Sequence, residues 1–485
     1  MSRAVPGMLC VALFVAVVLA ASPAASESAK EERSTGEADT GMDHIPGERV
    51  FDRDTAVFED KPGPQRRKLG PASGRLVIPE PWVIVPERFR VGSHELELHL
   101  LGYIKLDGLH DFEANGLGVG FPNEFLPAQI PPKGSLAARN RGRWGFTANS
   151  SRLEIGVGTT TPLGNAGGLL DFDFIRTLSG GPAFQLRQLY ATLGPLRVGQ
   201  SWTTFLNVES IPSTLDYQGP NAIPEVWQPL VRWTQPLAVG PLREYSLAKE
   251  FEFVVAAEEA NPQLTLPAGV SSRDDVPDIV ANLRWRRERS SVWVAGIYRR
   301  FEVRGAGVDA SANGWGLQLT GNIEVDPFPY LQFGVLYGKG LGRYFNDTDG
   351  LDVDGWVSPS GDLDLFSGFG AWIGIQHWWT APLRSTFTYS YVHLGDSDLR
   401  ALSAANPNGI YRKAHYASAN LVYSPIPPLD IGVEYLFGWR GTVDGRSGYD
   451  QRIQLSLILH FASGEVARGK RSLTDRLLGR EPEAN

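Results

Sequence analysis

The chain has 485 residues but only one cysteine, Cys10, which lies close to the N-terminus. A mature chain without it has no disulfide framework and no thiol chemistry. Beyond the N-terminal segment, no apolar run reaches the roughly 18 residues that a membrane-spanning helix needs. An excess of positive charge is missing too, because 46 basic residues stand against 54 acidic ones and the net charge is −8. This balance argues against nucleic-acid binding.

The N-terminus carries the pattern of a secretory signal peptide. An apolar run from Met8 to Ala21 is followed by small residues, which predicts a signal peptide over residues 1–25 with cleavage after Ala24 or Ala25. Leu9 precedes Cys10 where a lipoprotein signal needs a small residue, so lipidation is not expected. Export without disulfides points to the envelope of a Gram-negative bacterium.

Two further segments lack the hydrophobic periodicity of a folded element. Residues 26–90 are charged and rich in proline, without heptads, and we expect a mostly extended periplasmic segment. Residues 462–485 form a polar C-terminal extension. Between them, residues 91–461 contain no linker, only one strand-like segment after another, which predicts a single large barrel.

The strand-like segments alternate apolar and polar residues. In IGVEYLFGWR (Ile431–Arg440) and QRIQLSLILHF (Gln451–Phe461), every second side chain is apolar and its neighbours are polar or charged. A soluble sheet alternates in the same way, so the number of segments decides between the two. Sixteen segments of roughly ten residues predict an all-β fold, a transmembrane antiparallel β-barrel of about 16 strands.

The expected strands have approximate ends. They are 96–108, 143–161 with a bulge or break, 168–177, 183–193, 195–201, 228–236, 249–258, 278–287, 291–303, 313–325, 329–338, 367–380, 383–394, 411–424, 429–440 and 450–461. Tight, proline-marked connections such as Ala381-Pro382 alternate with long polar ones such as Asp111–Ser135, Asn346–Leu365 and Asp396–Gly409. Short periplasmic turns and long outer loops are typical of outer-membrane barrels.

One connection is long yet rich in residues that make contacts. Gly199–Trp227 contains two proline turns, at Pro212 and Pro220, which prevent a regular helix or strand. Trp202 and Phe205 are expected to anchor it against the wall. Long structured loops are usually functional. We expect this segment to fold into the lumen as a constriction loop.

Several motifs in one order resemble the DcaP-like outer-membrane porins. They are GYIKLD (Gly102–Asp107), GQSWTTF followed by TLDYQGPN within Gly199–Asn221, YGKGLGRY (Tyr337–Tyr344), Asn420–Arg440 and Gln451–Phe461. The resemblance covers nearly the whole barrel. It implies a homotrimeric, sixteen-stranded porin of the outer membrane that admits small anionic solutes, dicarboxylates among them, without a cofactor. Members often carry an N-terminal coiled coil, whereas residues 26–90 show no heptads.

Selectivity in such a channel requires lumenal charge. By strand phase, the basic residues predicted to face the lumen are Lys105, Arg152, Arg187, Arg232, Arg284, Arg286, Arg300, Arg440 and Arg452. Lumenal acids by phase make the lumen mixed, so more than half of these residues are expected to pair with carboxylates. The candidate constriction and substrate-binding residues are Arg187, Arg232, Lys105, Arg284, Arg286, Glu209, Asp216, Tyr217 and Asn221. Glu209 and Asp216 either oppose the basic wall or cap turns of the loop.

Other functions remain open from the residues alone. Net acidity suggests a general, weakly cation-preferring pore, and the tryptophans suggest a non-conducting envelope β-protein that binds carbohydrate. No catalytic motif or paired metal-ligand spacing is present, so neither an enzyme nor a metal site is expected. The segment Asn346–Gly355 loosely resembles a calcium loop, but its ligand spacing is incomplete. The expected partners are small polar or anionic solutes, outer-membrane lipid and lipopolysaccharide.

Overall fold

The computed structural model describes residues 49–52, 57–60, 88–91, 94–116, 124–175, 177–178, 181–238, 250–287, 290–325, 330–380, 382–395, 409–426 and 428–462. The predicted signal peptide, nearly all of the C-terminal extension and most of the Asp396–Gly409 loop lie outside these residues. Of the predicted extended segment 26–90, three short strands are described: β1 (Arg49–Asp52) and β2 (Val57–Asp60), which pair with each other, and β3 (Arg88–Val91).

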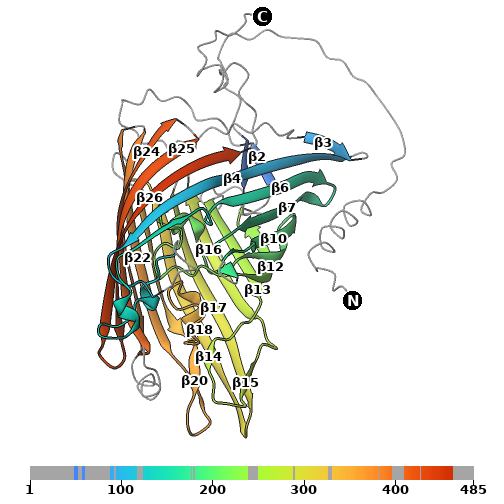
Figure 1. Ribbon diagram of the computed structural model, residues 1–485. Coiled ribbons are helices and arrows are strands. Elements are labelled where there is room, and N and C mark those ends of the chain that lie inside the picture. The colour runs from blue at the N-terminus through green and yellow to red at the C-terminus, as the bar shows by residue number, and fades with distance from the viewer. Residues whose placement is uncertain are drawn as a thin grey trace, which may run out of the picture. The chain divides into compact units, whose positions relative to one another are not determined.

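The chain divides into two compact units, Met1–Val50 with Phe58–Arg66, and Phe51–Val57 with Arg67–Asn485. The second unit contains a closed antiparallel barrel (Figure 1). Within the described residues, no helix is long and apolar enough to cross a membrane.

Sixteen strands close the barrel, which confirms the predicted fold class. The wall consists of β4 (His94–Asp111), β5 (Arg143–Thr147) continued by β6 (Arg152–Thr161), β7 (Gly164–Asp173), β10 (Gln185–Leu193), β11 (Leu196–Trp202), β12 (Trp227–Pro236), β13 (Phe251–Glu258), β16 (Asp278–Arg287), β17 (Ser290–Gly305), β18 (Val308–Ile323), β19 (Tyr330–Lys339), β22 (Ser367–Thr380), β23 (Leu383–Leu394), β24 (Tyr411–Ile426), β25 (Leu429–Thr442) and β26 (Ser447–Ala462). Smaller elements are β8 (Thr177–Leu178), β9 (Gly181–Pro182), β14 (Leu264–Thr265), β15 (Ser271–Arg273), β20 (Gly355–Val357), β21 (Leu363–Leu365) and the 3-10 turns η1 (Pro127–Gln129), η2 (Ala137–Arg139), η3 (Val208–Ser210) and η6 (Gly342–Tyr344).

The first and last wall strands pair with each other and close the ring. Ser456 of β26 lies opposite Asp107 of β4, and Leu457 lies opposite Leu106. Figure 1 shows the blue β4 beside the red β26. The predicted break in segment 143–161 is real, because β5 and β6 both pair with β4 and are separated at residues 148–151.

The two faces of the wall differ as the alternation predicts. Ile104, Leu106 and Leu317 expose 49% or more of their surface on the outer face. Their sequence neighbours Lys105 and Asp107 are buried at 1% on the inner face. A closed sheet that exposes apolar side chains outward and encloses polar ones is a membrane-spanning barrel, since closure pairs every backbone group. This is the architecture of outer-membrane proteins.

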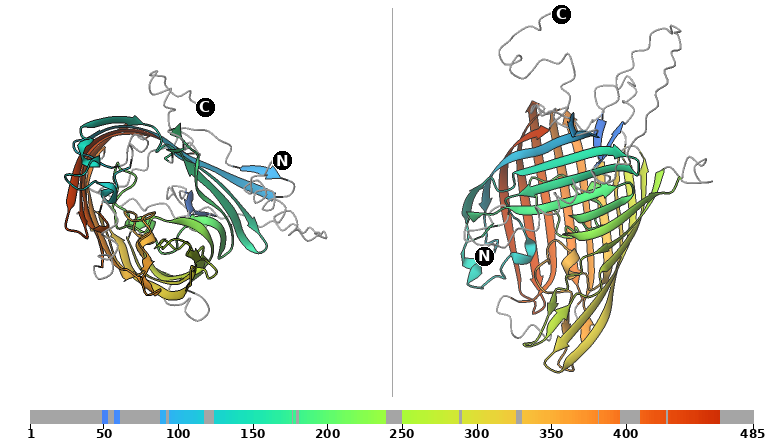
Figure 2. Two further views of the ribbon diagram at one scale, coloured as in Figure 1. Left: turned by 60° about the horizontal axis from the view of Figure 1, so that its bottom comes forward. Right: turned by 90° about the vertical axis from the view of Figure 1, so that its right-hand side faces the viewer.

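The connections place the remaining elements. Connections of only two residues separate β6 from β7, β16 from β17, β22 from β23 and β24 from β25 at one end of the barrel. Long segments follow β4, β11 and β19 at the other end. The left panel of Figure 2 looks along the barrel and shows segments lying inside the ring of strands. These inner segments carry the candidate site.

Candidate functional site

The connection between β11 and β12 folds into the lumen as predicted. The inward loop is Thr203–Val226, while the flanking Gly199–Trp202 and Trp227 belong to the strands. Its turn η3 begins after Asn207, whose side chain accepts a hydrogen bond from the Glu209 N–H at 3.1 Å. Most of its side chains are buried, with Val208, Glu209 and Ser213 as the exposed exceptions.

The loop begins in a polar clamp on β12, β13 and β16. Glu258 accepts hydrogen bonds from the Thr203 hydroxyl and the Thr204 N–H, both at 2.6 Å. Arg232 donates to the Thr204 hydroxyl at 2.7 Å, and Asn282 donates to the Thr204 carbonyl oxygen at 2.7 Å. Because both backbone groups of Thr204 are satisfied by the wall, the loop cannot leave it without exposing them.

The middle of the loop rests on β22. Trp372 donates its indole N–H to the Ser210 carbonyl oxygen at 2.9 Å. The neighbouring Gly374 gives room for Pro212, since a Cβ atom at Gly374 would lie 2.6 Å from the proline ring. The loop therefore packs directly on the backbone of the wall at this point.

The far end of the loop is held by β25 and β26. One oxygen of Glu434 accepts the N–H groups of Leu215 and Asp216, each at 2.7 Å, and Gln454 donates to the Leu215 carbonyl oxygen at 2.8 Å. Burial, and then the nearby Glu434 carboxylate, raise the pKa of Asp216 well above its ordinary value. Asp216 accepts the Gln218 N–H at 3.3 Å, so it caps a turn of the loop.

A second segment folds inward beside the loop. This second inward segment, Gly340–Phe366, connects β19 to β22, and its Tyr344 and Phe345 share a hydrophobic core with Phe205 and Ile223 of the inward loop. The Asn346 N–H donates to the Ile223 carbonyl oxygen at 2.9 Å. The two segments thus brace each other inside the barrel.

The part of this segment that resembles a calcium loop is built into the interior. Asp347 accepts the Ala128 N–H at 2.7 Å, the Tyr411 hydroxyl at 2.8 Å and the Asn221 amide at 3.3 Å. Asp354 is fully buried and pairs with Arg299. Within the described residues, no group of three or more His, Cys, Asp or Glu side chains is arranged to hold a metal ion. The acidic stretch is therefore only partly solvated, with Asp349 and Asp352 exposed and Asp347 and Asp354 buried.

Arg187 lies where the loop returns to the wall. A register shift between Leu186 and Gln188 in β10 turns both Arg187 and Gln188 inward, as a β-bulge does. The guanidinium lies beside the paired rings of Trp202 and Trp227, 5.4 and 4.2 Å from their centroids, which are 4.5 Å apart. The rings make cation–π contacts with the guanidinium, whose N–H groups remain for carboxylates.

Two carboxylates occupy that edge. Asp173 lies 2.5 Å from Arg187, and Glu225 of the inward loop lies 3.6 Å from it. Burial raises the pKa of Glu225 to about 7, against the opposing effect of the Arg187 charge. Glu225 was not among the predicted site residues, although Glu209 and Asp216 of the same loop were.

Arginines from neighbouring strands continue this side of the lumen. We call Arg187, Arg197, Arg232, Arg284 and Arg286 the arginine arc; they lie on β10, β11, β12 and β16. Arg232 donates to the Trp202 carbonyl oxygen at 2.6 Å, and Arg284 lies 3.8 Å from the Trp293 ring centroid. Arg286 is the most exposed of the predicted arc members, and Glu209 of the inward loop lies 3.4 Å from it. Of the two alternatives for the loop acids, Glu209 opposes the wall and Asp216 caps a turn.

Lys105 and Tyr217 meet on the other side of the loop. The ammonium group of Lys105 pairs with Asp107 and lies 4.5 Å from the centre of the Tyr217 ring. Tyr217 also packs edge-on against Tyr103 of β4. Asn221, in contrast, is fully buried against Asp347 and lies between the two inward segments.

Carboxylates neutralise most of the predicted basic set. At least six of the nine residues form ion pairs with acids, namely Lys105, Arg152, Arg187, Arg286, Arg300 and Arg452, as expected for more than half of them. The lumenal position predicted for Arg300 is wrong. Its neighbour Arg299 is buried at 1% and pairs with Asp278 and Asp354, while Arg300 bonds Ser311 and Asn313 on the outer face. In β17 the odd-numbered residues face inward, as the buried Trp293 and Arg299 show, so Arg300 faces outward.

Sequence reasoning also missed Arg197 and Arg343. Arg197 stacks on Tyr190 at 4.1 Å and donates to Ser201 at 3.1 Å. The alternation of β11 places Arg197 on the same face as the buried Ser201, so its inward position could have been predicted. Arg343 lies in the second inward segment and donates to Gln228 at 2.7 Å. It lies within the motif YGKGLGRY (Tyr337–Tyr344), which marks the segment but does not show where the side chain points.

Comparison with known proteins gives the fold a context. No protein-family model and no curated protein matches the sequence. The outer membrane channel DcaP of Acinetobacter baumannii is 20% identical and has a TM-score of 0.65, covering 77% of this chain and 99% of that chain. An anion-selective porin from Comamonas acidovorans is 10% identical, with a TM-score of 0.47 and coverage of 76% and 100%. OmpF of Salmonella typhi is 11% identical, with a TM-score of 0.44 and coverage of 77% and 100%. The sequence resemblance to DcaP-like porins is confirmed as a shared barrel fold.

Proposed function

We propose that the protein is an outer-membrane porin for passive diffusion of small hydrophilic solutes, with a preference for anions such as dicarboxylates. A membrane-spanning barrel with a polar interior and an inward loop suits a water-filled path whose width and charge are set by the loop. The proposal does not require a cofactor or a reaction.

The arginine arc is the observation that carries the preference for anions. Its five arginines lie on β10, β11, β12 and β16, on one side of the barrel wall. Arg232 donates to the Thr204 hydroxyl and the Trp202 carbonyl oxygen, and Arg284 donates to the Asn282 amide oxygen, so these contacts help to hold both guanidinium groups in place. A planar guanidinium forms two parallel hydrogen bonds with a carboxylate, and Arg286, 30% exposed, is the arc residue most open to a passing dicarboxylate, while the buried arginines act through their charge.

The same region contains the observation that favours the second candidate. Asp173, Glu209, Glu225 and Glu252 lie beside Arg187 and Arg286, and a passing cation would meet these carboxylates instead. A general, weakly cation-preferring pore follows if the acids dominate the field. The two candidate functions predict opposite ion preferences, anions for the first and cations for the second, and one measurement distinguishes them.

Single-channel recording in planar bilayers with a salt gradient tests the proposal. We expect a reversal potential of the sign for anion preference, and a shift toward cations in the double variant Arg187→Gln/Arg286→Gln. Arg300→Gln is the matched control, because Arg300 lies on the outer face of the same barrel. Unchanged permeability in the double variant would refute the role of the arc, and cation preference in the unaltered protein would favour the second candidate.

Conductance also separates a porin from a non-conducting envelope protein that binds carbohydrate. A barrel is expected to migrate differently on detergent gels before and after heating, and the gel checks that each variant has folded. Assembly as a homotrimer remains a prediction from the resemblance. Measurement of the mass of the detergent-solubilised protein tests it.

A further inference from the structure

Arg286 lies between two carboxylates that come from different elements. Its guanidinium is 3.4 Å from Glu209 of the inward loop and 3.5 Å from Glu252 of β13. The exposed fractions of these side chains are 30% for Arg286, 43% for Glu209 and 28% for Glu252. Both ion pairs are longer than the 2.5 Å pair that Arg187 forms with Asp173. A solute in the lumen therefore reaches this cation and both anions, and it competes with contacts that are not tight.

A second cation belongs to this cluster. Arg284 precedes Arg286 by two residues on β16 and therefore points to the same side of the sheet. It lies opposite Glu252 in the register between β13 and β16. We call Arg284, Arg286, Glu209 and Glu252 the mixed quartet; its two guanidinium groups and two carboxylates carry no net charge. A solute with a single charge of either sign is attracted by one half of the quartet and repelled by the other half.

Two buried hydrogen-bond donors lie beside the quartet. Ser291 of β17 lies opposite Arg286, and the Trp293 ring lies 5.3 Å from the Arg286 guanidinium. Ser291 is 1% exposed and Trp293 is 4% exposed. Among the described residues, neither the Ser291 hydroxyl nor the indole N–H of Trp293 has a hydrogen-bond partner. Buried donors require acceptors, and an oxygen of a bound carboxylate or of water supplies one.

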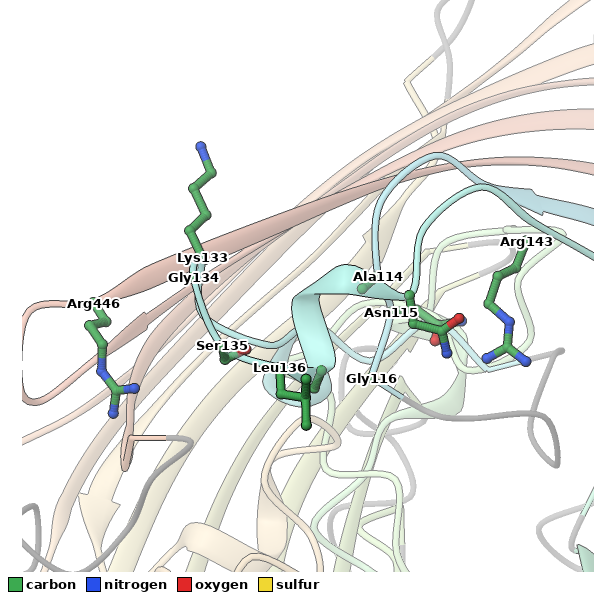
Figure 3. A pocket seen from close by; sticks show the side chains of 11 residues that line it. Ala114, Asn115, Gly116, Lys133, Gly134, Ser135, Leu136, Arg143 and Arg446 are labelled. Carbon is green, nitrogen blue, oxygen red and sulfur yellow. The ribbon is translucent and has the colours of Figure 1, made fainter.

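A hollow of about 790 Å³ at the loop end differs from the quartet in its charge and in its arrangement. Its charged residues are Lys133, Arg143 and Arg446, and the described residues that line it include no aspartate or glutamate. Figure 3 shows Lys133 and Arg446 on one side of a helical turn and Arg143 on the other, so the three cations do not converge. The quartet, in contrast, brings charges of both signs to within 3.5 Å of each other.

We propose that the mixed quartet binds zwitterionic solutes, with α-amino acids as the ligand class. The α-carboxylate accepts charge-assisted hydrogen bonds from Arg286, and the α-ammonium group donates to Glu209 and Glu252. One carbon atom separates these two groups of the ligand, which matches opposite charges that are direct neighbours in the quartet. A dicarboxylate satisfies Arg286 too, but its second carboxylate meets like charge. The inference rests on the proposed function for the path by which the solute enters, while binding itself does not require conductance.

Ligand-detected NMR on the detergent-solubilised full chain measures weak binding without a membrane or a current. Alanine, a zwitterion, is compared with its uncharged isomer lactamide, with the anion lactate and with the cation alaninamide. We expect alanine to bind at least about fivefold more tightly than each of the other three, a difference of about 1 kcal/mol. Added salt should weaken the binding of alanine, because the quartet is exposed to solvent.

Variants test the two signs of charge separately. Glu209→Gln/Glu252→Gln removes both anions and should weaken alanine binding at least about fivefold, while lactate binding is retained or strengthened. Arg286→Gln removes the accessible cation and should weaken alanine binding to a similar extent. The matched controls Arg300→Gln and Glu302→Gln each remove one partner of an ion pair on the outer face and should bind alanine like the unaltered protein. A heat-modifiable band on a detergent gel checks that each variant has folded.

Four outcomes would overturn the inference. Equal binding of alanine and lactamide removes charge from the recognition. Lactate binding as tight as that of alanine makes the quartet a site for anions, and equally tight binding of alaninamide makes it a site for cations. Unchanged alanine binding in either quartet variant places the binding site elsewhere in the chain. A failure of the proposed function appears separately, in the bilayer recordings, so the two failures are distinguishable.

Discussion

The pair formed by Arg187 and Glu225 makes ion selectivity sensitive to pH near neutrality. Burial raises the pKa of Glu225 to about 7. As the pH falls through this value, the carboxylate takes up a proton and its negative charge is lost, while the charge of Arg187 remains. The side of the lumen that faces the arginine arc therefore becomes more positive. Lowering the pH should increase the permeability to anions relative to cations.

The size of the effect follows from the fraction of charge that changes. With a pKa of about 7, roughly nine-tenths of Glu225 is ionised at about pH 8 and roughly one-tenth at about pH 6. A unit charge about 6 Å from a passing ion in water contributes about 0.7 kcal/mol. Because the charge acts with opposite sign on anions and cations, and roughly eight-tenths of it is lost, we expect the permeability ratio to change about fivefold to sevenfold between these pH values.

Reversal potentials in planar bilayers, recorded at several pH values under one salt gradient, measure the ratio. Glu225→Gln should abolish the dependence and hold the ratio at the low-pH value, because the amide is neutral throughout. Glu302→Gln is the control, since Glu302 pairs with the outward-facing Arg300. The reasoning is refuted by a flat profile in the unaltered protein, or by a dependence that survives Glu225→Gln.

Three further predictions concern the inner segments. Glu434→Ala leaves two buried N–H groups of the inward loop without their acceptor, at a cost of about 1–3 kcal/mol each. The single-channel current should therefore become larger and noisier. A heat-modifiable band on a detergent gel checks that the barrel is intact. Burial raises the pKa of Asp347 to about 6. The Asp347 carboxyl group therefore keeps its proton while the second inward segment is in place, whereas in the detached segment it loses the proton from about pH 3.8 upward. Protease sensitivity of residues 340–357 should therefore rise with pH across that window, and in Asp347→Asn this rise should be absent. Arg299→Met leaves two buried carboxylates unpaired and should lower the free energy of unfolding in denaturant by about 3–5 kcal/mol. The exposed Arg304→Met should lower it by at most about 1 kcal/mol. Equal losses would contradict the buried, inward position of Arg299.

The strand pattern could be predicted because it depends on local chemistry. Each of the sixteen expected segments corresponds to a wall strand, and the break between Thr147 and Arg152 was visible as a change of phase. The inward loop was also predictable in outline, since its prolines exclude regular structure and its aromatic residues need a surface to pack on. Trp202 is in fact the last residue of β11, stacked on Trp227, while Phe205 is buried in the interior core.

Individual site residues were less predictable, for geometric reasons. A single register shift in β10 turns Arg187 inward, and one position of phase exchanges Arg300 for Arg299 in β17. Strand periodicity is two residues, so an error of one residue reverses every assignment that follows. Partners on loops, such as Glu225, have no phase at all and come from other parts of the chain.

Repeated alternation of apolar and polar residues along the chain is enough to specify the class of the molecule, a membrane-spanning barrel. That information is local, because burial of every second side chain is written into each strand. Tertiary structure decided which charges face each other. The Glu434 carboxylate meets the backbone of Leu215 and Asp216, and Asp347 joins three segments, only because the barrel closes around them. Buried polar groups require partners, and closure of the ring selects those partners from residues far apart in the chain.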